Sequence, residues 1–222
     1  MAIKPILFNT EMVRAIMDGR KTCTRRMVKP QPDEKHTYQL GIVTDSTEKK
    51  EVGCFGFGIN EYGGSIQYVK PQYQPGDILY VRETWERFEC RNCEGDERGN
   101  CSKEPKKSVL DKTCGCYMYR ATDEISGDAK WHPSIHMPKE AARIWLKVTN
   151  VRVERLQEIS GEDLIREGID LFQSNYVRVA FDEFENIWNS TIKKSDLDRY
   201  GWDVDPWIWV IEFERCEKPK EV

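Results

Sequence analysis

Several features are missing from this sequence, and their absence narrows the classes of protein to which it can belong. No N-terminal apolar run has the length of a signal peptide, and no stretch approaches the length of a membrane span, so we expect a cytoplasmic protein. The formal net charge is −4, which argues against a protein that coats nucleic acid through a general positive field. The sequence also contains no internal repeat and no low-complexity segment.

Local features are therefore more informative than overall composition. The 222 residues suit one domain, or one domain with a sizeable insert. Seven Trp, nine Tyr and eight Phe are many for this length, and on a small barrel they form either the core or a base-stacking surface. Any contact with nucleic acid must use a local cationic patch. The most obvious patch comprises Arg20, Lys21, Arg25, Arg26 and Lys29.

The most informative segment, residues 19–26, places cations and hydroxyls just beyond a predicted helix. Asn9 or Thr10 can cap this helix, and Gly19 suits the left-handed position after its last turn. A turn with Lys and Arg donors beside Thr hydroxyls can bind a phosphate or a carbonyl, and a partly desolvated Lys can act as a base. The alternative is a solvated basic loop at a helix C-terminus, where cations are favoured in any case.

Core elements are predicted at both ends of the chain. Alternating apolar residues predict strands over 3–8, 78–81, 141–155 and 207–213. The last of these is apolar on both faces, which favours a central, buried strand. Capping and amphipathic patterns predict helices over 160–168 and 181–188.

The middle of the chain is predicted to hold inserted material. Residues 30–64 have a loop-like composition, and their only expected order is short hairpin strands such as 37–43. We expect a single α+β domain, 1–222, with insertions at about 30–72 and 88–130.

The second insertion carries five of the eight cysteines: Cys90, Cys93, Cys101, Cys114 and Cys116. In a reducing cytosol such clustering favours a metal over disulfides. Cys90 and Cys93, with Cys101 and one of the last two, can complete a tetrahedral structural zinc site that would hold this weakly apolar lobe together. Elemental analysis should then find about one zinc per chain. The alternative is a flexible loop with reduced thiols.

The pattern Gly19-x-Lys21-x-x-x-x-Arg26 resembles the signature of the ASCH domain, a branch of the PUA-like β-barrels linked to RNA. Blocks 75–81, 156–169 and 207–213 are similar to other parts of this family. The resemblance implies a closed or nearly closed barrel of about five or six strands, with peripheral helices at its rim and the cysteine-rich lobe inserted. In its longer form the chain looks most like phage and prophage-encoded ASCH proteins.

Small ASCH hydrolases that remove the acetyl group from N(4)-acetylcytidine use a Lys, a Thr and a Glu, which match Lys21, Thr24 and Glu167 here. The resemblance therefore implies an amidohydrolase in which Lys21 accepts a proton and Arg26 or backbone amides stabilise the oxyanion. The alternatives are an exposed helix-end carboxylate for Glu167 and a hydroxyl that satisfies the turn backbone for Thr24. This chain is longer than those enzymes, and its inserts could roof or block the cavity.

The predicted substrate-binding residues are Gly19, Arg26, Glu83 and Trp85. Strand alternation directs Glu83 either to a ligand or into a buried ion pair, for which Arg26 is one candidate partner. Trp85 could stack on a base or simply pack. His136, in a loop between prolines, could contact a ligand or hydrogen-bond a backbone carbonyl.

Three functions fit these residues. The first is an RNA- or nucleoside-binding protein that hydrolyses the amide of acetylated cytidine. The second is an RNA-binding module that uses the same cleft without turnover, and the third, least favoured, is a ribonuclease that uses Lys21 and Glu167. The sequence does not separate them, because all three place a cation beside an acid.

Overall fold

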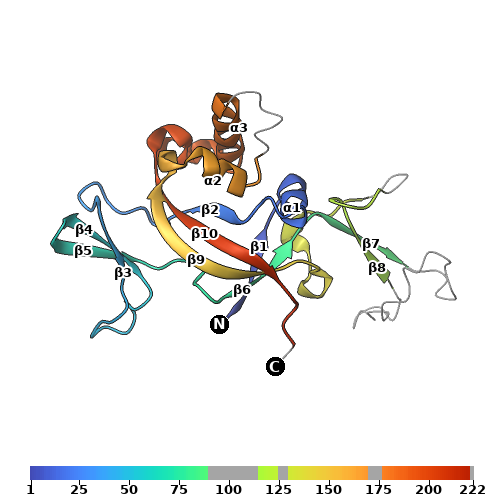
Figure 1. Cartoon of the computed structure of the whole chain (residues 1–222), viewed down its shortest axis with the longest axis horizontal. Helices are drawn as coiled ribbons and strands as arrows, with labels where there is room; N and C mark the ends of the chain where they lie inside the picture. The colour runs from blue at the N-terminus through green and yellow to red at the C-terminus, as the bar shows by residue number, and fades with distance from the viewer. Residues whose placement is uncertain (90–114, 125–129, 170–176, 221–222) are drawn as a thin grey trace.

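A five-stranded sheet forms the centre of the protein. The computed structural model describes residues 1–89, 115–124, 130–169 and 177–220. The strand order is β1-β6-β9-β10-β2, with β1 parallel to β6 and the other neighbours antiparallel. The bounds are Ile3–Leu7 (β1), Ile78–Arg82 (β6), Trp145–Arg155 (β9), Trp207–Cys216 (β10) and Cys23–Met27 (β2). Figure 1 shows β9 and β10 as long, bowed strands that lie side by side.

The ladders of this curved sheet do not close into a barrel within the described residues. β1 and β2 are its two edges, and no strand pairing joins them. A side chain spans the gap instead, because the Nη2 atom of Arg26 donates to the backbone oxygen of Leu7 at 3.1 Å. The prediction of a mixed α+β fold is confirmed, and the closed barrel stays a prediction.

Alternation along β10 separates two apolar cores. Trp207, Trp209 and Ile211 pack into one cluster, whereas Ile208 and Val210 pack into a second cluster on the helical side of the sheet. All five side chains are buried. The prediction of a central strand buried on both faces is therefore confirmed.

Helices cover one face of the sheet, as Figure 1 shows for α2 and α3. Their bounds are Thr10–Met17 (α1), Gly161–Arg166 (α2), Val177–Ser190 (α3) and Leu197–Tyr200 (α4), and the short 3-10 helices are Ser134–His136 (η1), Lys139–Ala141 (η2), Leu156–Glu158 (η3), Lys194–Asp196 (η4) and Trp202–Val204 (η5). Asn9 caps α1, and Ser160 and Asp163 form a capping box at α2, so both predicted helix starts are confirmed. No described helix is long and apolar enough to cross a membrane.

The first insertion is more regular than its composition indicates. It forms a three-stranded antiparallel sheet from β3 (Tyr38–Ile42), β4 (Phe55–Asn60) and β5 (Gly63–Val69). Phe55 and Phe57 on β4 contact the rings of Trp209 and Trp207, with centroids 5.1 and 5.3 Å apart. These apolar contacts with β10 order a segment that appears loop-like when its residues are considered without their tertiary partners.

The second insertion contributes to a two-stranded sheet that projects from the main body in Figure 1. Its strands are β7 (Trp85–Glu89) and β8 (Gly115–Tyr119). Four of the five cysteines predicted to bind zinc lie outside the described residues, and Cys116 lies on β8.

Candidate functional site

The candidate site forms where the segment after α1 meets the end of α2. The backbone N–H of Thr22 donates to the carbonyl of Arg166 at 2.9 Å. Gly168, just beyond α2, has a φ of +95°, and a Cβ atom at this position would lie 2.7 Å from the Cβ of Ala15 on α1. A glycine is therefore needed both for the backbone conformation and for the close approach of the two helix ends.

This approach brings Lys21 and Glu167 together across 146 positions of sequence. The Nζ atom of Lys21 donates to Oε2 of Glu167 at 2.5 Å and to its backbone oxygen at 2.8 Å. The two residues are only 2% and 7% exposed. The alternative of an exposed helix-end carboxylate for Glu167 is therefore wrong, since this side chain is one half of a buried ion pair.

Thr24 and Arg26 lie beside this pair on β2. The segment predicted as one turn becomes a strand at Cys23, so the side chains of Thr24 and Arg26 project from the same face of β2. Nη1 of Arg26 donates to Oγ1 of Thr24 at 2.9 Å. Arg26 and Lys21 both lie over the ring of Phe8, at 5.4 and 5.7 Å from its centroid. The Phe8 ring therefore links the Thr24–Arg26 pair to Lys21.

Burial lowers the pKa of the Arg26 guanidinium, and the negative charge of Glu167 partly opposes this effect. A guanidinium with reduced access to water interacts strongly with an anion that enters its surroundings. Arg26 also donates only to uncharged acceptors and lines a cavity, whereas Lys21 and Arg25 contact carboxylates, so Arg26 is the cation of this site best suited to contact a ligand.

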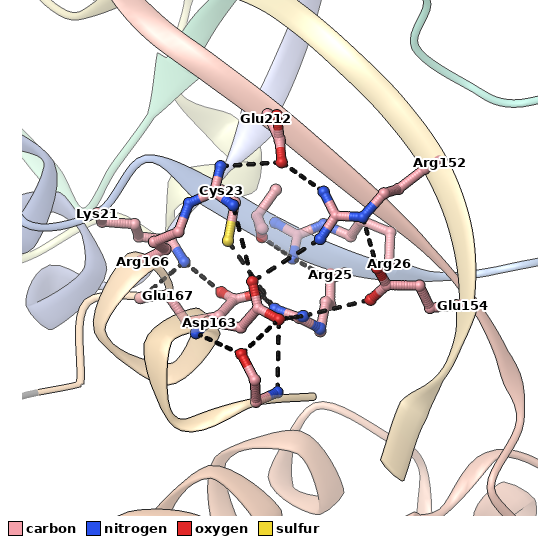
Figure 2. Close-up of polar contacts among 12 residues, drawn as sticks. Lys21, Cys23, Arg25, Arg26, Arg152, Glu154, Asp163, Arg166, Glu167 and Glu212 are labelled. Carbon is pink, nitrogen blue, oxygen red and sulfur yellow. Dashed lines mark hydrogen bonds and ion pairs between the residues drawn. The ribbon is translucent and has the colours of Figure 1, made fainter. Parts of the chain in front are cut away.

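A chain of ion pairs continues from Glu167 across the sheet (Figure 2). Arg25, which is buried, contacts Glu167, Asp163 and Glu154 at 3.3 to 3.5 Å. Glu212 on β10 contacts Arg166 at 2.9 Å. Including Lys21, the network consists of the four cations Lys21, Arg25, Arg152 and Arg166 and the four carboxylates Glu154, Asp163, Glu167 and Glu212.

Beyond Lys21 and Glu167, only Arg25 is a sequence-predicted functional residue, as part of the cationic patch, and the structure buries it among carboxylates instead. The other members of the network were not predicted. A signal was present, because Glu212 interrupts the apolar run of β10, and Arg152 and Glu154 alternate with buried valines on β9. Alternation places such residues on one face of a sheet, but it does not reveal their partners. Only the order of the strands shows that β9, β10 and the end of α2 bring these charges together.

Cys23, although close to the ion pairs, is poorly suited to act as a nucleophile. The side chain is fully buried, and burial, aided by the charge of Glu167, raises the pKa of its thiol to about 12. The thiolate is the reactive form of cysteine. At neutral pH this thiol therefore behaves as an apolar member of the core.

Two cavities border the cluster. One has a volume of about 200 Å³ and includes Arg26 in its wall, and the other, of about 80 Å³, includes Glu167. Neither of these two cavities is lined by Lys21 or Thr24. Each cavity therefore reaches one residue of the cluster, Arg26 or Glu167.

Two of the predicted substrate-binding residues have other partners. Glu83 is buried and accepts from two nitrogens of Arg143, each at 2.9 Å, so the ion-pair interpretation holds with a partner other than Arg26. Trp85 packs against Tyr117 and His132, with ring centroids 5.7 and 5.1 Å apart. Their described contacts do not connect either side chain to Lys21.

The remaining predicted residues are Gly19, His136 and the cysteines of the zinc site. Gly19 has a φ of +77° with open space where a Cβ would lie, as expected for the residue after α1. His136 is exposed on η1. Among the described residues, no group of His, Cys, Asp and Glu is arranged to hold a metal ion. The zinc site in the cysteine-rich lobe stays a prediction of the sequence.

No protein-family model matches this chain, and no curated protein or solved structure matches it either. The resemblance to the ASCH domain therefore rests on the sequence motifs.

Proposed function

We propose that this protein is an ASCH-type, PUA-like protein that binds a modified nucleoside or an RNA element at the Lys21 cluster and hydrolyses the amide of acetylated cytidine. The observation that carries the proposal is the buried contact between Lys21 and Glu167 beside the Thr24–Arg26 pair. Nothing in the local sequence pattern requires residues 146 positions apart to meet. Their meeting is what a shared catalytic role would require.

The chemistry assigns a role to each group. Glu167 accepts the proton of Lys21, and the neutral amine then accepts a proton from a water molecule, either directly or through the hydroxyl of Thr24, which takes up the water's proton as it passes on its own. The oxygen of water bonds to the acetyl carbon, the C–N bond breaks, and the cytosine amine takes up the proton. Arg26 stabilises the oxyanion. Because Oγ1 of Thr24 accepts from Arg26, its own hydrogen remains available to a base.

The second candidate is a binding module without turnover. It is favoured by the two acceptors that Glu167 offers to the Nζ atom of Lys21, because such a lysine can join the two helix ends without any chemical role. In this case Arg26 and nearby aromatic rings would bind the nucleoside, and Lys21 would only shape the site.

Turnover of N(4)-acetylcytidine, measured beside binding and cleavage of RNA, tests the proposal. Lys21→Arg is expected to fold and to retain binding but to lose about 10²- to 10⁴-fold in turnover, because a guanidinium does not accept a proton at neutral pH. Thr24→Val should also lose turnover, and Lys139→Ala, an exposed change on η2, serves as the control. Circular dichroism shows whether each variant is folded.

Each result decides between the candidates. Wild-type protein that binds RNA without turnover supports the binding module, and cleavage of RNA supports the ribonuclease. Full turnover in folded Lys21→Arg eliminates Lys21 as the base. A wild-type protein that neither binds nor hydrolyses any of these molecules refutes the proposal.

A further inference from the structure

The lining of the larger cavity, beside Arg26, combines cations with apolar and aromatic side chains. The cavity has a volume of about 200 Å³. The cations of the lining are Arg26, Lys29 and Lys70, and the other lining residues are Met27, Pro71, Gln72, Tyr73, Val151, Trp209 and Ile211. No carboxylate lines the cavity. The cavity is therefore locally cationic, although the whole chain carries a net negative charge.

The three cations are not neutralised by ion pairs within the described part of the chain. Arg26 donates to Thr24 and to two backbone oxygens, which are all uncharged acceptors. Lys29 lies 5.3 Å from the ring centroid of Tyr200 and is exposed, and Lys70 is exposed as well. This arrangement contrasts with Lys21 and Arg25, which both contact carboxylates. Unpaired cations around one hollow attract an anion.

Two aromatic rings of the lining, those of Trp209 and Tyr73, are held in place by their contacts. Trp209 is buried and held by the edge-on ring of Phe55, at 5.1 Å between centroids and 68° between planes. The hydroxyl of Tyr73 donates to the backbone oxygen of Pro5 at 2.8 Å, which fixes that ring. A flat or apolar group can pack on these rings while an attached anion contacts the cations. A nucleotide has both parts, because it combines a base and sugar with a phosphate.

We propose that this cavity is a phosphate-binding subsite for one nucleotide of an RNA strand, so that the protein acts on a nucleotide within RNA rather than on a free nucleoside. This inference rests on the proposed function, because Arg26 belongs both to the cavity and to the Thr24 cluster. A phosphate on Lys29 and Lys70 would fix the strand, and Arg26 would lie between it and the proposed reacting group.

Calorimetric titration with cytidine, cytidine 5′-monophosphate and a short oligocytidylate tests the subsite. The wild type should bind the monophosphate and the oligonucleotide at least about tenfold more tightly than cytidine, as a charged hydrogen bond to phosphate implies. Lys70→Ala should lower the affinity for both phosphate-bearing ligands by about tenfold and leave cytidine unchanged. For the oligonucleotide, the slope of log K against log salt should fall by about 0.7 per lost phosphate contact.

Two matched variants control for general charge. Lys70→Arg should retain affinity, and Lys139→Ala, which removes an exposed lysine outside the cavity lining, should behave as the wild type. Equal binding of cytidine and its monophosphate by the wild type, no detectable binding of the oligonucleotide, or equal losses in Lys70→Ala and Lys139→Ala would each overturn the subsite.

The test separates this inference from the proposed function. If turnover depends on Lys21 while Lys70→Ala has no effect on any ligand, only the subsite is rejected. If Lys70 governs phosphate binding while no acetylated cytidine is hydrolysed, the subsite stands and the hydrolase does not.

Discussion

At the scale of single residues, the same atoms that suggest chemistry also hold the structure together. Lys21 is a candidate base, and it also joins two helix ends through its contacts with Glu167. Arg25 extends this contact to Asp163 and Glu154. Removing one partner of a buried ion pair leaves the other charge buried without compensation. The loss of folding free energy then exceeds the net stabilisation that the intact pair provides. Variants of this cluster must therefore be compared for stability before their activity is interpreted.

Glu167→Gln is expected to lower the free energy of unfolding by about 3–5 kcal/mol, because Lys21 then stays buried without its carboxylate. Urea denaturation at neutral pH measures the change. Glu11→Gln removes the exposed partner of Arg14 and should cost less than about 1 kcal/mol. Equal losses in the two variants would show that the buried pair has no special role.

At the scale of elements, the site depends on how closely α1 and α2 approach. The capping box of Ser160 and Asp163 fixes where α2 begins, and Gly168 lets the chain turn away beside Ala15. Gly19 ends α1 in the same left-handed conformation, but the space where its Cβ atom would lie is open. The two glycines share a left-handed backbone and differ in packing.

This difference predicts unequal effects of alanine at the two glycines. Gly19→Ala should cost about 1–2 kcal/mol, which is the strain of a left-handed alanine. Gly168→Ala adds an overlap with Ala15 and with the Cβ of Lys21, so it should cost at least about 1 kcal/mol more and move Lys21 away from Glu167. Urea denaturation and turnover assays of both variants check this. Identical behaviour of the two variants would contradict a close contact at Gly168.

At the scale of the whole molecule, carboxylates connect segments that are distant in sequence. Asp77 accepts from Lys4 and from the backbone of Ala2, which ties the start of the chain to β6. Asp163 and Glu212 connect α2 with β9 and β10 through arginines. Burial raises the pKa of each of these carboxyls, but their hydrogen bonds and cations outweigh burial and lower the pKa overall.

Acid should therefore destabilise the protein. In the unfolded chain these carboxyls regain ordinary pKa values of about 4, so between that value and their lower folded pKa the unfolded chain binds more protons. Their stabilisation is fully present well above pH 4 and is lost as the pH falls through the folded pKa values. Urea denaturation from pH 7 to pH 3 measures this loss. In Asp77→Asn the decline should be shallower, and stability that is constant or rises on acidification would refute the argument.

The sequence by itself determined the features that depend on residues close together in the chain, namely helix starts and strand burial. Asn9 and Ser160 marked the starts of two helices, and the apolar run of β10 indicated a central strand, because caps and periodicity act over a few positions. The hairpin strand predicted over 37–43 is confirmed as β3, but the sequence did not reveal the complete three-stranded sheet, since Phe55 and Phe57 are ordered by tryptophans more than 140 positions away.

Only the tertiary structure decided which charges meet. The resemblance to the ASCH domain predicts that Lys21 and Glu167 share one site, but no local sequence pattern places them together. Arg25, Arg152 and Glu212 join them because β2, β10 and β9 are adjacent strands and α2 ends over this part of the sheet. The residue type alone shows that a side chain is charged. Its partner depends on the path of the chain, which is determined by packing across the whole sheet.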